Sequence, residues 1–351
     1  MKSEKAVNVK LKVPGHDNFF GPAESRKEVM RRIQEQEEVY TQFQKLTDNL
    51  QEEFVSFCMG VRGLNVTYDP VFSMIFNPER HPERLEDFLT HCLKRDVEIL
   101  KVMQNDSQKL VQDGTYLSMD IVVRLKSRET ANVEIQRVGY LFPGQRCACY
   151  SSDLVMRQYS QVHEEKKRAG EKFSYQDIKT VYTIVLIKDS TGEFKAIPDQ
   201  YLHYGKQVFD TGLELDMVQE YLLIPLDIFL QNHHNISSKL DAWLYFLASD
   251  SPEDIRKVVE AYPEFEELYR EIFYFRYHVE ELMSMFSEAL RILDRNTVEY
   301  MIEQKQAQVE RLEAENRRLE EESRRQAEES QKKVEALERE LARLKKQDSK
   351  N

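Results

Sequence analysis

YLSMDIVVRL at residues 116–125 and ANVEIQRV at residues 131–138 are the two stretches that decide the fold. Both are rich in β-branched and aliphatic residues, which favour strands, and the polar loop KSRET separates them. Two strand-forming runs around a short polar loop are typical of a β-hairpin. We therefore predict an antiparallel strand pair near the middle of the chain.

The two acids of this hairpin, Asp120 and Glu134, are predicted to face each other. The midpoint of their numbers is residue 127, which lies inside the loop, so they take opposite positions on the two strands. Opposite residues have Cβ atoms about 5 Å apart, and Gln136, two residues after Glu134, shares their face. Facing carboxylates repel each other unless a proton or a cation intervenes. The pattern predicts a site for a hard cation such as Mg²⁺, or else a polar, solvated face of the hairpin.

The remaining strand and helix patterns predict an α/β fold. VYTIVLI at residues 181–187 is a continuous apolar run, as expected of a central strand covered on both faces, and residues 221–224 are a fourth candidate. Apolar spacings predict helices over residues 24–57, from about residue 83 onwards, and over 147–167. This order predicts a mixed sheet flanked by helices.

The length, charge and composition of the chain exclude several classes of protein. The chain has 351 residues, which allow two or three domains, and carries 50 Lys+Arg against 62 Asp+Glu, a net charge of −12. An acidic chain does not bind DNA through its overall field, so a contact with DNA requires a local basic surface. The sequence has no apolar run of membrane-spanning length, no secretory signal and only four scattered cysteines. We expect a soluble cytoplasmic protein with no membrane partner.

The C-terminal segment follows a heptad pattern. One apolar seam comprises Val309, Leu312, Asn316 and Leu319 at alternating a and d positions, and a second, shifted in register by three residues, comprises Val334, Leu337, Leu341 and Leu344. An Asn at an a position favours a parallel helix pair, so we expect a homodimer formed by this coiled coil. The alternative is a single solvated helix, stabilised by opposite charges four residues apart.

The hairpin, with D-I-V-V before the loop and V-E-I-Q after it, resembles the core of the PD-(D/E)xK nuclease superfamily. It resembles most closely the Rpn-like recombination-promoting nucleases, or PD-(D/E)xK family transposases. Four further motifs resemble this branch in order, over about residues 64–295: T-Y-D-P-V-F-S-M-I-F at 67–76, R-C-A-C-Y at 146–150, F-S-Y-Q-D-I-K-T-V-Y-T-I-V-L-I at 173–187 and D-A-W-L-Y-F-L at 241–247. The superfamily's lysine is Gln136 here, as is usual in this branch, and its usual proline before the first acid is Met119.

The resemblance implies a restriction-endonuclease-like fold, DNA as the substrate, and Mg²⁺ or another divalent cation as the cofactor. Asp120, Glu134 and the backbone carbonyl of Ile135 are expected to hold the cation against the scissile phosphate. Gln136 carries no charge, but its amide is able to orient the attacking water or to donate to a phosphate oxygen. Asp120, Glu134 and Gln136 are therefore the catalytic candidates.

Three accessory residues have both a functional and an ordinary interpretation. Asp69 adds a further acid to the site, or it caps the helix that begins before Pro70. Arg146 contacts phosphate, or it pairs along its own helix. Tyr150 stacks or hydrogen-bonds at the site, or it packs in the helix interface.

These patterns predict four parts of the chain. They are an N-terminal helical arm over residues 1–63, a nuclease-like core over 64–250, a helical extension over 251–302 and a coiled coil over 303–351. The expected function is a metal-dependent DNA endonuclease associated with transposition or recombination. The alternatives are a catalytically decayed relative that only binds DNA or a partner, and a coiled-coil scaffold protein.

Overall fold

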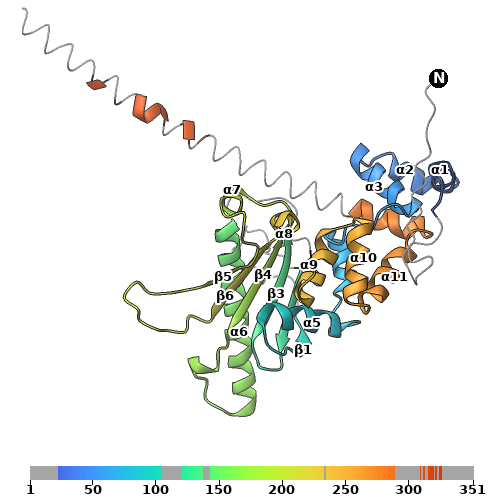
Figure 1. Ribbon diagram of the computed structural model, residues 1–351. Coiled ribbons are helices and arrows are strands. Elements are labelled where there is room, and N and C mark those ends of the chain that lie inside the picture. Colours follow the sequence, from blue (N-terminus) through green and yellow to red (C-terminus); the bar gives the residue numbers. More distant parts are fainter. Residues whose placement is uncertain are drawn as a thin grey trace, which may run out of the picture. The chain divides into compact units, whose positions relative to one another are not determined.

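The computed structural model describes residues 23–103, 120–136, 143–232 and 235–288, together with 309, 311–312, 315–319, 321 and 324–325 (Figure 1). The chain divides into two compact units, Met1–Asn296 and Thr297–Asn351. The first unit holds the sheet, and the second holds the segment predicted to form a coiled coil.

A mixed sheet forms the centre of the first unit. The strands found among the described residues are β1 (Ile99–Val102), β2 (Ile121–Leu125), β3 (Thr130–Gln136), β4 (Val181–Ile187), β5 (His203–Lys206) and β6 (Gln219–Pro225), in the order β1-β2-β3-β4-β6-β5. β2 and β3 are antiparallel, whereas β3, β4 and β6 run parallel. The predicted mixed sheet with flanking helices is confirmed.

The hairpin forms in the predicted register. Ile121 pairs with Val133 and Arg124 pairs with Thr130, so the midpoint of the pairing is residue 127. β4 lies between β3 and β6, and six of its seven residues are buried. The prediction of a doubly covered central strand is therefore confirmed.

The sequence pattern does not predict β1 and β5. Each has only four residues and lies at an edge of the sheet, where half of the side chains are exposed. β5 has the sequence His-Tyr-Gly-Lys, which has no apolar alternation to indicate a strand. The parts of the predicted hairpin strands at residues 116–119 and 137–138 lie outside the described residues.

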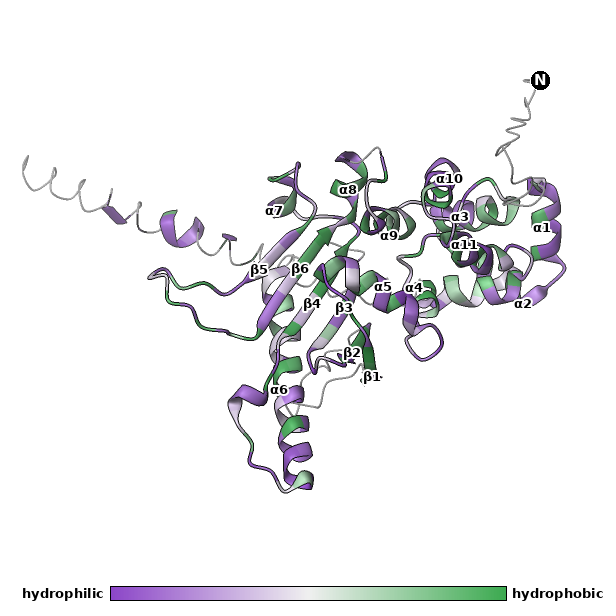
Figure 2. Cartoon of the chain, turned by 60° about the horizontal axis from the view of Figure 1, so that its bottom comes forward, coloured by the Kyte–Doolittle hydropathy of each residue, from purple (hydrophilic) through white to green (hydrophobic). Residues whose placement is uncertain are grey.

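Helices cover both faces of the sheet (Figure 1). On one face, side chains of β2, β3 and β4 join the main core of the unit, to which helices contribute from α4 (Asp69–Ile75), α5 (Pro82–Leu93) and α9 (Lys239–Ala248). On the other face, α6 (Pro143–Ala169) packs Tyr150 and Leu154 against Val122. Figure 2 shows hydrophobic and hydrophilic residues interspersed along α6, as expected of a helix with one face on a sheet.

The prediction of one helix over residues 24–57 is wrong. The structure has three helices there, α1 (Arg26–Gln34), α2 (Glu37–Phe43) and α3 (Asp48–Met59). Gln36 and Thr47 have extended backbone conformations, and the Thr47 hydroxyl accepts the N–H of Leu50 to cap α3. The apolar spacing continues across both breaks, so it does not reveal them.

The other described elements complete the helical part of the unit. They are η1 (Tyr175–Asp177), α7 (Gly192–Lys195), α8 (Leu226–Asn232), α10 (Pro252–Ala261) and α11 (Phe265–Tyr274). Trp243 of α9 is 2 % exposed and its ring lies against Phe76 and Phe265, which makes it a core residue. None of the helices in the described part is both long and apolar enough to cross a membrane.

In the second unit the described residues of the first heptad seam are helical and exposed. Val309, Leu312 and Leu319 are 52, 53 and 56 % exposed in the single chain. The second seam, from residue 334 to residue 344, lies outside the described residues. The coiled coil stays a prediction.

Candidate active site

Asp120 and Glu134 orient each other through main-chain hydrogen bonds. Asp120 directly precedes β2 and Glu134 lies within β3, where the hairpin register places them opposite each other. The N–H of Asp120 donates to Oε1 of Glu134 over 3.1 Å, and the N–H of Ile135 donates to Oδ2 of Asp120 over 2.6 Å. Each carboxylate is therefore held by the strand that carries the other.

The surroundings of this pair disfavour full ionisation. The pKa of Asp120 is raised from 3.8 to about 7. Burial is the largest cause, the Ile135 N–H acts in the opposite direction, and the charge of Asp69 adds to the rise. Glu134 is only 4 % exposed, and burial together with the charge of Asp120 holds its pKa well above the ordinary range. Two facing acids of this kind share a proton at neutral pH or attract a cation.

Gln136 brings a buried amide to the same face of the sheet. It follows Glu134 by two residues, and the two pair with Ile187 and Val185, which contact the α6 side of the sheet. The Gln136 side chain is 5 % exposed, and its Nε2 has no hydrogen-bond partner among the described residues. A buried donor without a partner costs about 1–3 kcal/mol, a penalty that a bound water or phosphate oxygen would remove.

Arg146 and Tyr150 lie together at the start of α6, close to the acids. Nη2 of Arg146 donates to the hydroxyl of Tyr150 over 3.2 Å, one helical turn away. The charge of Arg146 lowers the pKa of Glu134, whereas burial and the charge of Glu134 raise the pKa of Tyr150. Between them, burial raises the pKa of Cys147 to about 11, so this thiol stays neutral at physiological pH. The start of α6 thus supplies a cation and a neutral hydroxyl to the site.

Asp69 approaches the pair from a distant part of the sequence. It is the first residue of α4, and Tyr68 occupies the N-cap position with no side-chain cap hydrogen bond. The interpretation of Asp69 as the N-cap before Pro70 is therefore wrong. The charge of Asp69 raises the pKa of Asp120, so the two carboxylates are electrostatic neighbours. The fold brings a third acid towards the pair.

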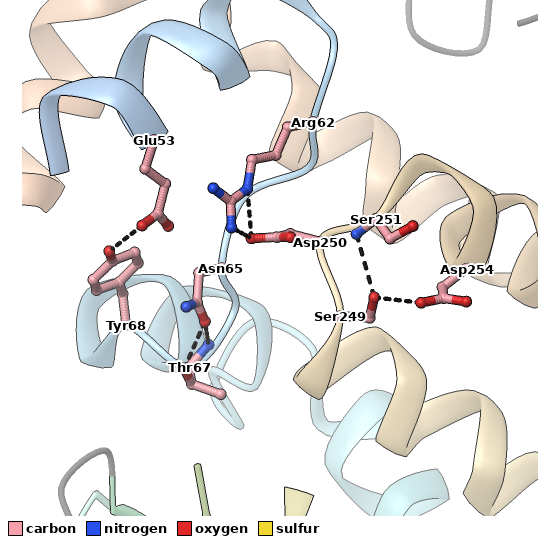
Figure 3. Close-up of polar contacts among 9 residues, drawn as sticks. All are labelled: Glu53, Arg62, Asn65, Thr67, Tyr68, Ser249, Asp250, Ser251 and Asp254. Atoms are coloured by element: carbon pink, nitrogen blue, oxygen red, sulfur yellow. Dashed lines mark hydrogen bonds and ion pairs between the residues drawn. The ribbon is translucent and has the colours of Figure 1, made fainter. Parts of the chain in front are cut away.

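The residues just before Asp69 are held by local and tertiary hydrogen bonds (Figure 3). The hydroxyl of Tyr68 donates to Oε2 of Glu53 in α3 over 2.9 Å. Oδ1 of Asn65 accepts the N–H and the hydroxyl of Thr67, at 3.1 and 2.6 Å, which closes a tight turn. The position of Asp69 is thus tied to the N-terminal helices.

An ion pair fixes the start of the same segment to the end of α9 (Figure 3). Nε and Nη2 of Arg62 donate to Oδ2 of Asp250 over 2.8 and 2.6 Å, and the N–H of Gly63 donates to the carbonyl of Asp250 over 2.8 Å. The hydroxyl of Ser249 donates to Oδ2 of Asp254 over 2.6 Å and steadies this junction. The segment between α3 and α4 is therefore pinned at both ends.

Comparison with known families decides the family of the chain. The sequence model of the PD-(D/E)XK nuclease family transposase matches residues 66–301, which is two thirds of the chain. The chain belongs to the PD-(D/E)XK nuclease family transposases. No curated protein and no solved structure matches it. The match begins three residues before Asp69 and contains all the described strands, so it confirms the resemblance seen in the sequence.

The oxygen donors of this transposase-family protein fit a hard divalent cation. No three His, Cys, Asp or Glu side chains among the described residues gather into a ready metal cluster. Asp120 and Glu134 supply two carboxylates, and Mg²⁺ is commonly bound by one or two carboxylates while water and phosphate oxygens complete its shell. The burial and repulsion that raise their pKa values are offset by a cation placed between them.

Asn132 and Thr183 are polar residues of β3 and β4 that none of the sequence motifs includes. Asn132 lies two residues before Glu134, Thr183 is its register partner on β4, and both are 0 % exposed. The alternation of side chains along a strand could have indicated Asn132, since residues 132, 134 and 136 lie on the same face. Thr183 had no signal, because the pairing of β3 with β4 is not visible in one sequence.

Proposed function

We propose that this protein is a cytoplasmic, metal-dependent DNA endonuclease that hydrolyses phosphodiester bonds in transposition or recombination. The interlocked pair of Asp120 and Glu134 carries the proposal, because two buried, facing acids fit a shared divalent cation. Membership of a nuclease family supports the same chemistry. A solvated pair of hairpin acids has no need of burial or of main-chain donors to both side chains.

Asp120, Glu134 and the backbone carbonyl of Ile135 would hold the cation, for which Mg²⁺ suits the oxygen donors. When bound, such a cation polarises the phosphoryl oxygen and lowers the pKa of the water that attacks phosphorus. The protein supplies the positioning. The Ile135 N–H holds Asp120 in place, and the Asp120 N–H does the same for Glu134.

Gln136 and Arg146 act on the phosphate in this proposal. The unpartnered Nε2 of Gln136 donates to a phosphate oxygen or orients the attacking water, in place of the lysine common in the superfamily. Arg146 places a permanent positive charge beside the acids, where a phosphate group carries negative charge. Tyr150 steadies the guanidinium of Arg146 through its hydroxyl.

Asp69 is proposed to be a third acid that acts on the same cation, directly or through a water. Its effect on the pKa of Asp120 supports proximity. Its anchored segment supports a fixed position, since Tyr68 is bound to Glu53.

DNA as the substrate is consistent with a local basic region in an otherwise acidic chain. Residues 143–187, from the start of α6 to the end of β4, carry seven Lys and Arg against five Asp and Glu, whereas the whole chain has a net charge of −12. Phosphate contacts dominate affinity for DNA. Arg146 of this stretch acts electrostatically on Glu134, so it supplies a positive charge for a phosphate at the start of α6.

A homodimer is proposed for the full chain. Val309, Leu312 and Leu319 leave an apolar seam half-exposed in the single chain, and a parallel partner would bury it. Asn316 lies at an a position of that seam, where two aligned amides hydrogen-bond across a parallel pair. Two subunits would bring two active sites to the two strands of a duplex.

Plasmid cleavage tests the proposal. The purified full-length protein is expected to nick or linearise supercoiled plasmid in Mg²⁺ and to do neither in EDTA. DNA binding without cleavage in Mg²⁺ or Mn²⁺ would favour a catalytically decayed relative. A dimer that neither binds nor cuts DNA would favour the coiled-coil scaffold.

A further inference from the structure

Four aromatic rings lie together at the C-terminal end of α6, away from the acids. They belong to Tyr159 and His163 of α6, to Phe173, and to Tyr175, the first residue of η1. The centroids of neighbouring rings are 5.3 to 6.3 Å apart, which is the usual spacing of ring contacts in proteins. We call these four residues the aromatic cluster. The catalytic residues of the proposed function include none of them.

The aromatic cluster is open to solvent. Tyr175 is 79 % exposed and His163 is exposed, whereas Tyr159 and Phe173 are half-buried. Figure 1 shows the end of α6 and the segment after it projecting past the ends of the strands. Burial of apolar surface is what stabilises a fold, so packing accounts for Tyr159 and Phe173 but not for Tyr175.

Hydrogen bonds and ion pairs fix the segment that carries Tyr175. Ser174 forms a capping box with Asp177, whose carboxylate accepts the N–H of Ser174 over 2.9 Å. Lys166 of α6 lies 2.7 Å from Glu171 and 3.5 Å from Asp177, so it ties this segment to the helix. The exposed ring is therefore presented from a fixed backbone, which lowers the entropic cost of binding a partner.

The charges around the aromatic cluster leave an excess of cations. Lys172 precedes Phe173, and Lys167 lies one helical turn after His163. Both lysines are exposed, and neither forms an ion pair within the part of the chain that the structure describes. Each carboxylate of residues 163–179, in contrast, has a cation as partner: Glu164 pairs with Arg168, Glu165 with Arg124, and both Glu171 and Asp177 with Lys166.

We propose that the aromatic cluster binds single-stranded DNA, with bases stacked on Tyr175 and His163 and phosphates held by Lys167 and Lys172. Every base has a flat face, so aromatic rings next to cations bind a single strand whatever its sequence. A duplex hides the faces of its bases within its own stack, which is why exposed rings favour unpaired DNA. This inference rests on the proposed function for the choice of DNA as the nucleic acid.

The aromatic cluster lies at a defined distance from the start of α6. Tyr159 follows Arg146 by 13 residues on this one helix, which corresponds to about 20 Å at 1.5 Å per residue. A stacked strand covers that distance with roughly six nucleotides at 3.4 Å each. The cluster would thus hold unpaired DNA several nucleotides away from the acids.

Fluorescence anisotropy with a labelled oligo-dT of about 15 nucleotides tests the proposal on the full-length protein in EDTA. Tyr175→Ala should bind this strand about 5- to 150-fold more weakly than wild type, as is typical when one stacking ring is removed. Tyr175→Phe keeps the ring and should bind like wild type. Tyr277→Ala is the matched control, because it removes a ring that is 49 % exposed but lies outside the aromatic cluster. Unchanged affinity in Tyr175→Ala, or no binding by wild type, overturns the proposal.

The salt dependence of the same binding tests the phosphate contacts. Each such contact contributes about 0.7 to the slope of log K against log salt for a single strand. Lys172→Gln and Lys167→Gln should therefore each lower the slope by about 0.7. Lys257→Gln should leave it unchanged, because Lys257 lies on α10 and pairs with carboxylates of that helix. A slope that neither cluster lysine changes would overturn the proposal.

Two further measurements separate this inference from its rivals. Tyr175→Ala should unfold at the wild-type temperature and keep the wild-type mass by light scattering, because its ring is exposed. A fall in mass would make the aromatic cluster a contact between subunits and overturn the proposal. Oligo-dT binding that depends on Tyr175, without plasmid cleavage in Mg²⁺, would defeat the proposed endonuclease and support this inference. Plasmid cleavage with oligo-dT binding insensitive to Tyr175→Ala would do the reverse.

Discussion

The main-chain N–H of Ile135 donates to Oδ2 of Asp120 over 2.6 Å, so the strand that carries one acid also fixes the other. This bond belongs to the backbone and survives any side-chain change at residue 134. The acids are therefore separable by mutation, because loss of the Glu134 carboxylate leaves Asp120 oriented. Under the proposed function both acids hold one cation, so we expect either loss to be severe.

Asp120→Asn and Glu134→Gln are each expected to abolish Mg²⁺-dependent plasmid cleavage while the fold survives. Each change keeps the side-chain size but removes one of two facing charges, so the metal-free variants should melt roughly 1–3 °C above wild type. Gel assays of cleavage and thermal unfolding in EDTA measure the two effects. Cleavage at wild-type rates by both variants would show that the site lies elsewhere.

Asp120 should make the metal-free protein less stable as pH rises. Its pKa of about 7 in the folded state exceeds the ordinary 3.8, so between these values the folded protein keeps a proton that the unfolded chain has released. The stabilisation is complete below about pH 4 and is lost as pH rises through 7, by at most about 4 kcal/mol. Denaturant unfolding in EDTA at pH 5 and pH 8 should show a larger loss in wild type than in Asp120→Asn. Identical losses would contradict this, and Mg²⁺ should restore stability at pH 8.

Gln136→Leu should lower cleavage by about 10²–10³-fold, as is typical when one donor to a developing charge is removed. The Leu variant should be at least as stable as wild type, because the lost amide Nε2 has no partner among the described residues. Gln136→Lys restores the residue common in the superfamily and should keep part of the activity. Initial rates at saturating Mg²⁺ measure the series, and full activity in Gln136→Leu would make residue 136 an ordinary strand position.

Tyr68→Phe removes the hydroxyl that binds Glu53 and should lower cleavage about 10-fold by loosening Asp69. Asp69→Asn should have a larger effect, since it removes the acid itself. Tyr204→Phe is the matched control, because it removes a hydroxyl that donates to the carbonyl of Cys92 outside this segment. Single-turnover cleavage rates should be measured at several Mg²⁺ concentrations. The rate should depend more strongly on Mg²⁺ concentration in Tyr68→Phe than in the control Tyr204→Phe.

Deletion of residues 303–351 should convert a dimer to a monomer, because it removes both predicted apolar seams. Nicking should persist, since all the proposed catalytic residues lie before residue 151, while double-strand cleavage should weaken. Light scattering measures the assembly, and the ratio of nicked to linear plasmid measures the cleavage. A full-length chain that is already monomeric at micromolar concentration would favour the single solvated helix.

The β2–β3 hairpin was predictable from the sequence, because the residues that pair in it are close together in the chain. The hairpin register follows from residues only 14 apart, so Asp120 and Glu134 could be paired from the sequence. β5 could not be found, because a four-residue edge strand is only half-buried and shows no apolar alternation. The breaks at Gln36 and Thr47 were hidden because apolar spacing continued through them.

The surroundings of the acids were not predictable from one sequence. The proximity of Asp69 to Asp120 depends on tertiary packing, as does the Tyr68 to Glu53 hydrogen bond. The burial of Asn132 becomes visible only once α6 is known to cover the strand. Sequence patterns identify the candidate acids, whereas the protonation and orientation of these acids depend on neighbours from distant segments.

The ion pair between Arg62 and Asp250 joins residues 188 positions apart, which has a consequence for synthesis of the chain. A ribosome that has just added Asp120 needs roughly 7–26 s more to reach Asp250, at about 5–20 residues per second. Until then the segment that leads into Asp69 lacks its second anchor. A nascent chain that already contains the hairpin thus still lacks this anchor of Asp69, and under the proposed function we expect cleavage of DNA only after most of the chain has been made.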